Sequence, residues 1–261
     1  MAELTPMMKQ YLEIKKDNPD SILFFRLGDF YEMFADDAKL ASKELDLTLT
    51  SRDHGKNAKP EEERVPMCGI PYHASESYIA RLIAKGYKVA ICEQMEDPAT
   101  AKGLVKRDII RVVTPGTVIS SSMLEDSKNN YLCAVYADSA RYGLCLCDLS
   151  TGEVYATAFP AGGENLDHLK NELARFHPAE ALLSAGAWEV DGLRDFLKER
   201  LDCPCENGGE GRFRPDVARA LAEKQFQSGL DGLGAGEEAA VQAAGALLSY
   251  LYETQKTDLG H

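Results

Sequence analysis

The sequence predicts two mixed α/β domains in tandem, and three observations lead to this fold class. The chain has 261 residues, which is long enough for two domains that each bury their own core. Short apolar runs typical of strands alternate with segments whose apolar residues recur at helical spacing. A polar, turn-rich stretch over 114–130 separates two groups of such elements. We therefore expect a first domain over 1–117, a linker over 118–130 and a second domain over 131–261.

The first domain is expected to begin with a helix at Thr5-Pro6, where a capping hydroxyl precedes a proline at the first helical position. The apolar run over 22–27 predicts a strand. Asp29, with Glu32 three residues later, fits the acidic variant of a capping box and predicts a helix as far as Glu44. The remaining elements expected here are a polar loop over 53–64, strands over 65–70, 87–92 and 108–113, and a helix over 75–85 closed by Gly86.

The second domain is expected to open with three strands joined by tight turns, over 131–136, 142–148 and 153–159. A further strand is expected over 179–183. Four helices are expected over 166–176, 190–200, 214–223 and 237–254, with Gly-rich loops over 203–212 and 229–236. The last helix is long and Ala-rich, and no element follows it. We expect the chain to be a fragment of a longer protein, with this helix leading into a missing core.

Charge is distributed unevenly along the chain. The formal net charge is −13, with a pI of about 4.9. Taken whole, this argues against nucleic acid, because DNA binding usually needs Lys and Arg to neutralise phosphates. Residues 1–118, however, carry 17 Lys+Arg and 19 Asp+Glu, a net of −2, which leaves −11 for the remainder. Two basic clusters in the first part are open to interpretation as solvated loops or as a phosphate-contacting edge: Arg52, Lys56 and Lys59, then Lys102, Lys106, Arg107 and Arg111.

Several functional classes are disfavoured by what the sequence lacks. It has no apolar run of about 18 residues and no signal-peptide pattern, so we expect a cytoplasmic protein without a membrane span. Seven Cys without framework spacing fit reduced thiols. There is no GxxxxGK[ST] phosphate-binding loop, so this chain is not expected to hydrolyse ATP or to be an enzyme, and we assign no catalytic residue.

Metal and nucleophile motifs are equally weak. The pairs Cys203 with Cys205 and His168 with His177 do not match zinc spacing, and no metal site is expected. Cys68 lies near His73, but nothing orients the pair, and an apolar setting favours a core role for this thiol. Asp138 and Asp148 lie in or beside turns of the second domain. They leave open a metal-dependent nuclease of the RNase H type, which needs several converging carboxylates.

The segment Gly28-Asp-Phe-Tyr-Glu-Met-Phe34 contains two adjacent aromatic residues, Phe30 and Tyr31, at a predicted helix start. Two neighbours on one helical turn cannot both face one core. An exposed Phe beside a carboxylate suggests an apolar wedge with a polar reader next to it. Proteins that kink DNA insert such side chains between base steps at a cost of a few kcal/mol per step. That cost is lowest where a base is already mispaired.

Six motifs follow one another in the first part of the chain: GDFYEMF (28–34), DLTLTSR (46–52), PMCGIPYHA (66–74), VAICEQ (89–94), DPATAKG (97–103) and RVVTPGT (111–117). In the order and spacing of these motifs, the whole chain closely resembles the N-terminal part of the bacterial MutS family of DNA mismatch repair proteins. The resemblance implies a mixed α/β mismatch-binding domain followed by an RNase H-like α/β connector domain. The family's Phe-x-Glu motif falls on Phe30 and Glu32. By this resemblance Phe30 stacks on the mispaired base from the minor groove, and Glu32 hydrogen-bonds that base.

The resemblance also implies further contacts and partners. Tyr31, Arg52, Met67 and Gly69 match positions expected near the lesion. Mismatched double-stranded DNA is the expected ligand, and a MutL-type protein is the expected partner of the connector, which relays to the ATPase. The full-length family forms homodimers and binds ATP and Mg²⁺ in parts that would follow residue 261, so no cofactor is expected here. Two alternatives stay open: a module that binds only proteins, favoured by the acidic second half, and an RNase H-like nuclease.

Overall fold

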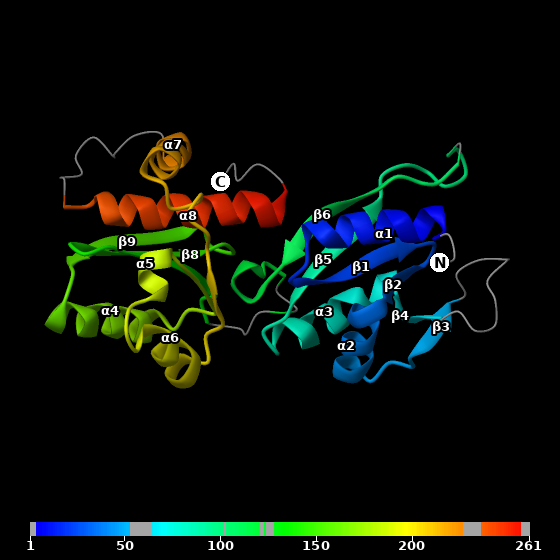
Figure 1. Ribbon diagram of the computed structural model, residues 1–261, viewed down its shortest axis with the longest axis horizontal. Helices are drawn as coiled ribbons and strands as arrows, with labels where there is room; N and C mark the ends of the chain where they lie inside the picture. Colours follow the sequence, from blue (N-terminus) through cyan, green and yellow to red (C-terminus); the bar gives the residue numbers. More distant parts are fainter. Residues whose placement is uncertain are drawn as a thin grey trace. The chain divides into compact units, whose positions relative to one another are not determined.

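A computed structural model describes residues 4–52, 64–101, 103–120, 123, 128–226 and 236–256. The chain divides into two compact units, Met1–Thr114 and Pro115–His261 (Figure 1). Both are mixed α/β units, as the sequence predicted. The first unit ends three residues before the boundary expected from the turn chemistry. The short helical turn η2 (Pro115–Thr117) belongs with the second unit, where the Gly116 N–H donates to Glu180 Oε2 at 3.0 Å.

In its described part, the first unit contains a six-stranded sheet of order β3-β4-β2-β1-β5-β6. Its strands are β1 (Ser21–Leu27), β2 (Phe30–Phe34), β3 (Thr50–Arg52), β4 (Val65–Pro71), β5 (Lys88–Gln94) and β6 (Arg107–Val113). β1 and β5 pair in parallel, and the other neighbours are antiparallel. The predicted polar loop lies outside the described residues except for Arg64. The predicted strands over 22–27, 65–70, 87–92 and 108–113 are confirmed to within two residues.

Helix α1 (Pro6–Asp17) covers one face of this sheet, whereas α2 (Ala35–Leu45) and α3 (Ser75–Ile83) lie on the other (Figure 1). The predicted cap of α1 is confirmed, since Thr5 Oγ1 accepts a hydrogen bond from the Met8 N–H at 3.3 Å. The sheet side under α1, here called the α1 face, carries a core made by the helix and the central strands. Its buried members are Met8, Tyr11, Leu23, Phe25, Phe34, Ala90, Cys92, Ile109 and Val112.

The helix predicted from Asp29 to Glu44 is wrong in its first part. Residues Phe30–Phe34 form strand β2, and α2 begins only at Ala35. The two residues that fit a capping box instead belong to a hairpin: Asp29 lies in its turn, and Glu32 lies in β2, which pairs with strands on both sides. This also explains the adjacent aromatics: neighbouring residues of a strand point to opposite faces.

In its described part, the second unit contains a five-stranded sheet of order β11-β10-β7-β8-β9. Its strands are β7 (Tyr131–Ala137), β8 (Arg141–Asp148), β9 (Glu153–Pro160), β10 (Glu180–Leu183) and β11 (Cys205–Asn207). The first three pair as antiparallel hairpins, and β10 and β11 add in parallel on the far side of β7. This is the strand order of the expected RNase H-like fold. β11 falls in a segment predicted as a Gly-rich loop, so that prediction is wrong for these three residues.

Helices cover both faces of the second sheet. α4 (Gly163–Phe176), α5 (Ala185–Trp188) and α6 (Leu193–Asp195), with the following turn η3 (Phe196–Arg200), pack on one face. α8 (Glu238–Gln255) packs on the other, with α7 (Pro215–Phe226) outside it (Figure 1). α8 lies so close to the sheet that a Cβ at Gly143 would come 1.9 Å from the Ala239 carbonyl oxygen. This approach requires small residues, which accounts for the Ala-rich composition of the helix.

Two further predictions concern segments at the margins of the structure. The Gly-rich stretch over 229–236 lies outside the described residues except for Gly236, and so does most of 121–127 in the predicted linker.

Within the described ranges, none of the helices combines the length and the apolar character that a membrane crossing requires.

Candidate nucleic-acid interface

The β1–β2 hairpin presents Phe30 at the first position of β2. Its turn has two residues, Gly28 and Asp29, because Leu27 pairs directly with Phe30. Gly28 adopts a φ of +58°, a left-handed conformation that glycine enters without the steric penalty other residues meet. Phe30 is 47% exposed, although it is a large apolar residue on a strand.

Phe30, Glu32 and Phe34 occupy the same face of β2, and their burial changes sharply along the strand. Phe34 is fully buried under α1, with its ring centroid 5.0 Å from that of Tyr11. Phe30 lies outside that core cluster, and Glu32 is half-buried between the two. The α1 face is therefore closed at one end of β2 and open at the other.

The open end of this face extends onto β4. Glu32 pairs with Gly69, and a Cβ at Gly69 would lie 3.5 Å from Glu32 Cγ, so the glutamate stem passes over the glycine. Met67 pairs with Phe34 and is half-buried at the margin of the core. We call Phe30, Glu32 and Gly69 the open strip, and Met67 marks the point where this strip meets the core. Four of the six predicted contact residues thus lie together on one face.

Tyr31 does not share this surface. Its side chain is directed to the face covered by α2 and α3, where it is buried and its ring centroid lies 5.9 Å from that of Phe24. The Tyr31 hydroxyl donates to Glu93 Oε1. Burial, then the hydrogen bond to Glu93, raises the pKa of Tyr31 well above its ordinary value. The hydroxyl therefore stays protonated and remains a hydrogen-bond donor.

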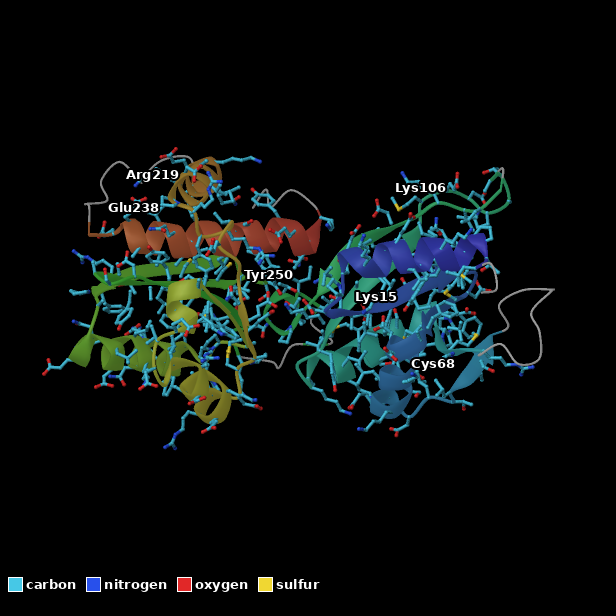
Figure 2. All side chains as sticks on the ribbon, viewed as in Figure 1. Lys15, Cys68, Lys106, Arg219, Glu238 and Tyr250 are labelled. Carbon is cyan, nitrogen blue, oxygen red and sulfur yellow. The ribbon has the colours of Figure 1, made fainter. Side chains whose placement is uncertain are left out.

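The basic residues predicted near DNA have separate locations. Arg52 belongs to β3 and pairs with Val65, but its side chain lies outside the described part. Lys106 is exposed and directly precedes β6 (Figure 2). Arg107 is buried: its Nε donates to the Arg26 carbonyl at 2.7 Å, and its Nη1 donates to Gln10 Oε1 at 3.0 Å. The interpretation as a phosphate-contacting edge is thus wrong for Arg107, which joins α1 to the sheet.

Asp138 and Asp148, the carboxylates on which the nuclease alternative depended, do not converge. Asp138 caps the β7–β8 turn by accepting from the N–H groups of Ala140 and Arg141 at 2.7 and 2.8 Å. Asp148 is buried at the other end of β8 and accepts from the Ser150 N–H at 2.9 Å. The length of β8, at a rise of about 3.3 Å per residue, separates these carboxylates by roughly 20 Å. They cannot share one catalytic metal ion.

Neither the possible metal ligands of the described residues nor the Cys68 thiol is arranged for catalysis. Among the residues that the structure describes, no three His, Cys, Asp or Glu side chains are grouped so as to hold a metal ion. Cys68 is buried on the α2 side of the sheet, where its Sγ lies 3.5 Å from the Ala38 carbonyl (Figure 2). Burial, then the Asp37 charge, raises the pKa of Cys68 to about 11. A thiol in this state is a poor nucleophile at neutral pH.

Sequence reasoning missed Arg26 and Glu93, which form an ion pair at 3.1 Å behind the hairpin. A signal was present, because Arg26 interrupts one apolar strand run and Glu93 directly follows another, and charged side chains are rarely buried unless they are paired. Their partnership depends on the parallel pairing of β1 with β5, which places residues far apart in the sequence side by side.

Comparisons with known proteins match the chain along both units. The family description "MutS domain I" matches residues 5–122, and "MutS domain II" matches residues 130–261. The DNA mismatch repair protein MutS of Acetivibrio thermocellus is 48% identical over all of this chain, and that of Pelotomaculum thermopropionicum is 51% identical over 98% of it. The MutS protein of Methanococcoides burtonii is 47% identical over the whole chain. In each case the chain spans 29% of the relative's length.

Proposed function

We propose that the first unit of this chain, which belongs to the MutS family of DNA mismatch repair proteins, binds mismatched double-stranded DNA through the open strip. Phe30 inserts from the minor groove and stacks on the mispaired base, and Glu32 forms a hydrogen bond with that base. The observation that carries the proposal is a half-exposed Phe at the start of a strand, with a carboxylate two residues along the same face.

The energetics of wedge insertion favour a mismatch over a paired site. Kinking a duplex by inserting an apolar side chain costs a few kcal/mol per unstacked step. A mispaired base is already poorly stacked, so the same insertion costs less there, and discrimination comes mainly from deformability. A near-neutral unit can therefore select a mismatch without the strongly basic surface that general DNA binding requires.

Glu32 and Gly69 would set how closely a base can approach. A carboxylate near phosphates is disfavoured by repulsion, so Glu32 must accept a hydrogen bond from the base or donate one as the protonated acid. Gly69 is exposed beside it and has no Cβ to obstruct an approaching strand. Met67 and Arg52 are proposed as flanking contacts. Tyr31 is not included, because its buried ring faces away from the strip.

The second unit is proposed to act as a connector. Its acidic sequence suits a basic partner surface, and we propose a MutL-type protein as that partner and the homodimer as the assembly of the longer protein. ATP and Mg²⁺ are proposed to bind in parts of the relatives that this chain does not match. We further propose that the connector relays DNA binding to those parts, as a cytoplasmic component of mismatch repair.

The test is a titration of this chain with labelled mismatched and matched duplexes at low and high salt. Phe30→Ala should abolish the preference for the mismatch and leave weak, salt-sensitive binding to both duplexes. Phe226→Ala is a matched control, because Phe226 is also exposed, at 38%, and lies on α7 in the second unit. An unchanged ratio of mismatched to matched affinity in Phe30→Ala would contradict the wedge role.

Two substitutions at Glu32 separate its charge from its hydrogen bond. Glu32→Gln keeps a hydrogen-bonding group and removes the charge that phosphates repel. It should bind the mismatch more tightly than Glu32→Ala does. Both variants lack the charge, so equal weakening would show that the Gln amide does not replace the hydrogen bond of Glu32, and weakening of Glu32→Gln relative to Glu32 would show that charge repulsion is not the relevant effect. If the unsubstituted chain binds neither duplex at low salt, the alternative of a module that binds only proteins is favoured.

A further inference from the structure

On the face opposite the open strip, polar side chains from three strands meet, and two of them donate hydrogen bonds to one carboxylate oxygen of the third. Glu93 Oε1 on β5 accepts a hydrogen bond from Arg26 Nη1 on β1 at 3.1 Å and another from the Tyr31 hydroxyl on β2. These groups are largely removed from water: the Arg26 and Glu93 side chains are 16% and 23% exposed, and Tyr31 is buried. The three residues lie on the face opposite Phe30.

Arg26 extends this arrangement to the turn that precedes Phe30. Its Nε donates to the Gly28 carbonyl at 2.6 Å, and its guanidinium carbon lies 3.6 Å from the centroid of the Tyr72 ring. The Tyr72 N–H in turn donates to the Asp29 carbonyl at 3.0 Å. Both carbonyls of the two-residue turn are therefore engaged, and one guanidinium connects the turn to the sheet behind it.

An ion pair removed from water adds little net stability where it joins three strands, because the cost of desolvation offsets much of the attraction between the charges. Apolar side chains of similar volume would hold the strands as well. What they would not supply is a directional hydrogen bond to the Gly28 carbonyl, which fixes the backbone one residue before Asp29 and two before Phe30. The arrangement thus restricts the hairpin at the point where the exposed side chain emerges.

We propose that Arg26, Tyr31 and Glu93 are positioning residues that hold Phe30 in its inserting orientation before DNA arrives. This inference rests on the proposed wedge function. A side chain ordered in advance loses less conformational entropy on binding, so the contact is stronger for the same contact area.

The test places 4-fluorophenylalanine at position 30 alone and measures its ¹⁹F resonance in the full chain. The variants are Arg26→Met, which keeps the aliphatic stem, and Tyr31→Phe, which removes only the hydroxyl. Tyr11→Phe is the matched control: Tyr11 also donates to a carboxylate, Asp37 Oδ2 at 3.2 Å, but at the buried end of β2. The network variants should broaden or split the resonance, whereas Tyr11→Phe should leave it narrow.

The same proteins, without the fluorine label, are titrated with mismatched and matched duplexes. Arg26→Met should lower the mismatch preference about tenfold, the effect of losing a hydrogen bond to a charged group, and Tyr31→Phe should lower it less. Because both act through Glu93 Oε1, the double variant should fall short of the product of the two effects. Circular dichroism and thermal unfolding measure whether each variant is folded. If Arg26→Met does not fold, Tyr31→Phe, which removes only a hydroxyl, provides the test.

The two proposals fail in different ways. If Phe30→Ala removes the preference while Arg26→Met and Tyr31→Phe keep a wild-type resonance and a wild-type preference, the network only packs, and the positioning role is wrong. A disturbed resonance with an unchanged preference would overturn it as well. If Phe30→Ala itself changes nothing, the wedge function fails.

Discussion

The two sheets of this protein use their faces differently. Helices cover both faces of the central strands β7 and β8 of the second sheet, and the backbone of α8 approaches Gly143 directly, whereas Val154 and Tyr155 are exposed on the edge strand β9. The first sheet is covered on one face by α2 and α3, but α1 protects only part of the other and leaves the open strip exposed. Apolar residues of the closed faces contribute to stability, whereas an apolar residue on the strip is available for a ligand.

Gly143→Ala should severely destabilise the second unit. The new methyl group would collide with the Ala239 carbonyl oxygen at 1.9 Å, and backbone on both sides leaves little room to adjust. We expect a loss of about 3 kcal/mol or more. Urea unfolding followed by the fluorescence of Trp188, the one tryptophan of the chain, reports this unit. Gly211→Ala, which meets no atom within 4 Å, is the control; equal stability of the two variants would show that α8 can move away.

Phe34→Ala and Phe30→Ala compare the closed and open ends of one strand. Phe34 is fully buried, so its truncation should cost about 3–5 kcal/mol. Phe30 is half-exposed, and its truncation should change stability by no more than about 0.5 kcal/mol. Thermal and urea unfolding by circular dichroism measure both. A large loss of stability in Phe30→Ala would mean that this ring belongs to the core, which would remove the basis for a wedge.

Alkaline pH should destabilise both units. Burial raises the pKa of Cys68 to about 11 and that of Cys92 to about 12 in the first unit, and burial, then Asp148, raises that of Cys147 to about 11 in the second. Unfolded thiols titrate near a pKa of about 8.5, so above that pH the folded state holds more protons than the unfolded state. The stabilisation is complete below the unfolded value and falls as pH rises toward the folded values, by up to about 1.4 kcal/mol per pH unit for each thiol.

The same titration compares the two units. Burial also raises the pKa values of Cys133, Cys145 and Cys203 in the second unit. Stability should therefore fall more steeply there between about pH 9 and 11. Urea unfolding at several pH values, followed by Trp188 fluorescence for the second unit and by hydrogen exchange of β2 for the first, measures the two slopes. Equal slopes would indicate that the additional thiols are not sequestered.

Gly69→Ala should have a small effect on stability and a clear effect on binding. Its Cβ would lie 3.3 Å from the Tyr31 carbonyl oxygen and 3.5 Å from Glu32 Cγ, which is tight but tolerable on an open surface. We expect a stability change within about 1 kcal/mol and a weaker preference for mismatched DNA, since a methyl group then occupies the approach beside Glu32. Gly211→Ala is again the control. Full retention of the preference would remove Gly69 from the proposed contact surface.

Most elements were predictable because their signals are local. The Thr5-Pro6 cap, the apolar run of β1 and the turn chemistry at 114–117 each act within a few residues. The start of α2 was misplaced because Asp29 and Glu32 fit a helix cap locally, while pairing with β1 and β4 makes the segment a strand. β11 was missed because three residues carry little periodicity, and only β10 beside them supplies their hydrogen bonds.

Local sequence patterns were enough to single out candidates for recognition: Phe30 with Glu32 two residues later, and Gly69 in another strand segment. Which of these candidates share a surface depended on how the strands pair. Strand register places Glu32 beside Gly69 and directs Tyr31 to the opposite face, where Glu93 and Arg26 meet it from other strands. The physical reason is that propensities and caps act along the chain, whereas burial, shared hydrogen bonds and an uncovered face depend on which strands become neighbours.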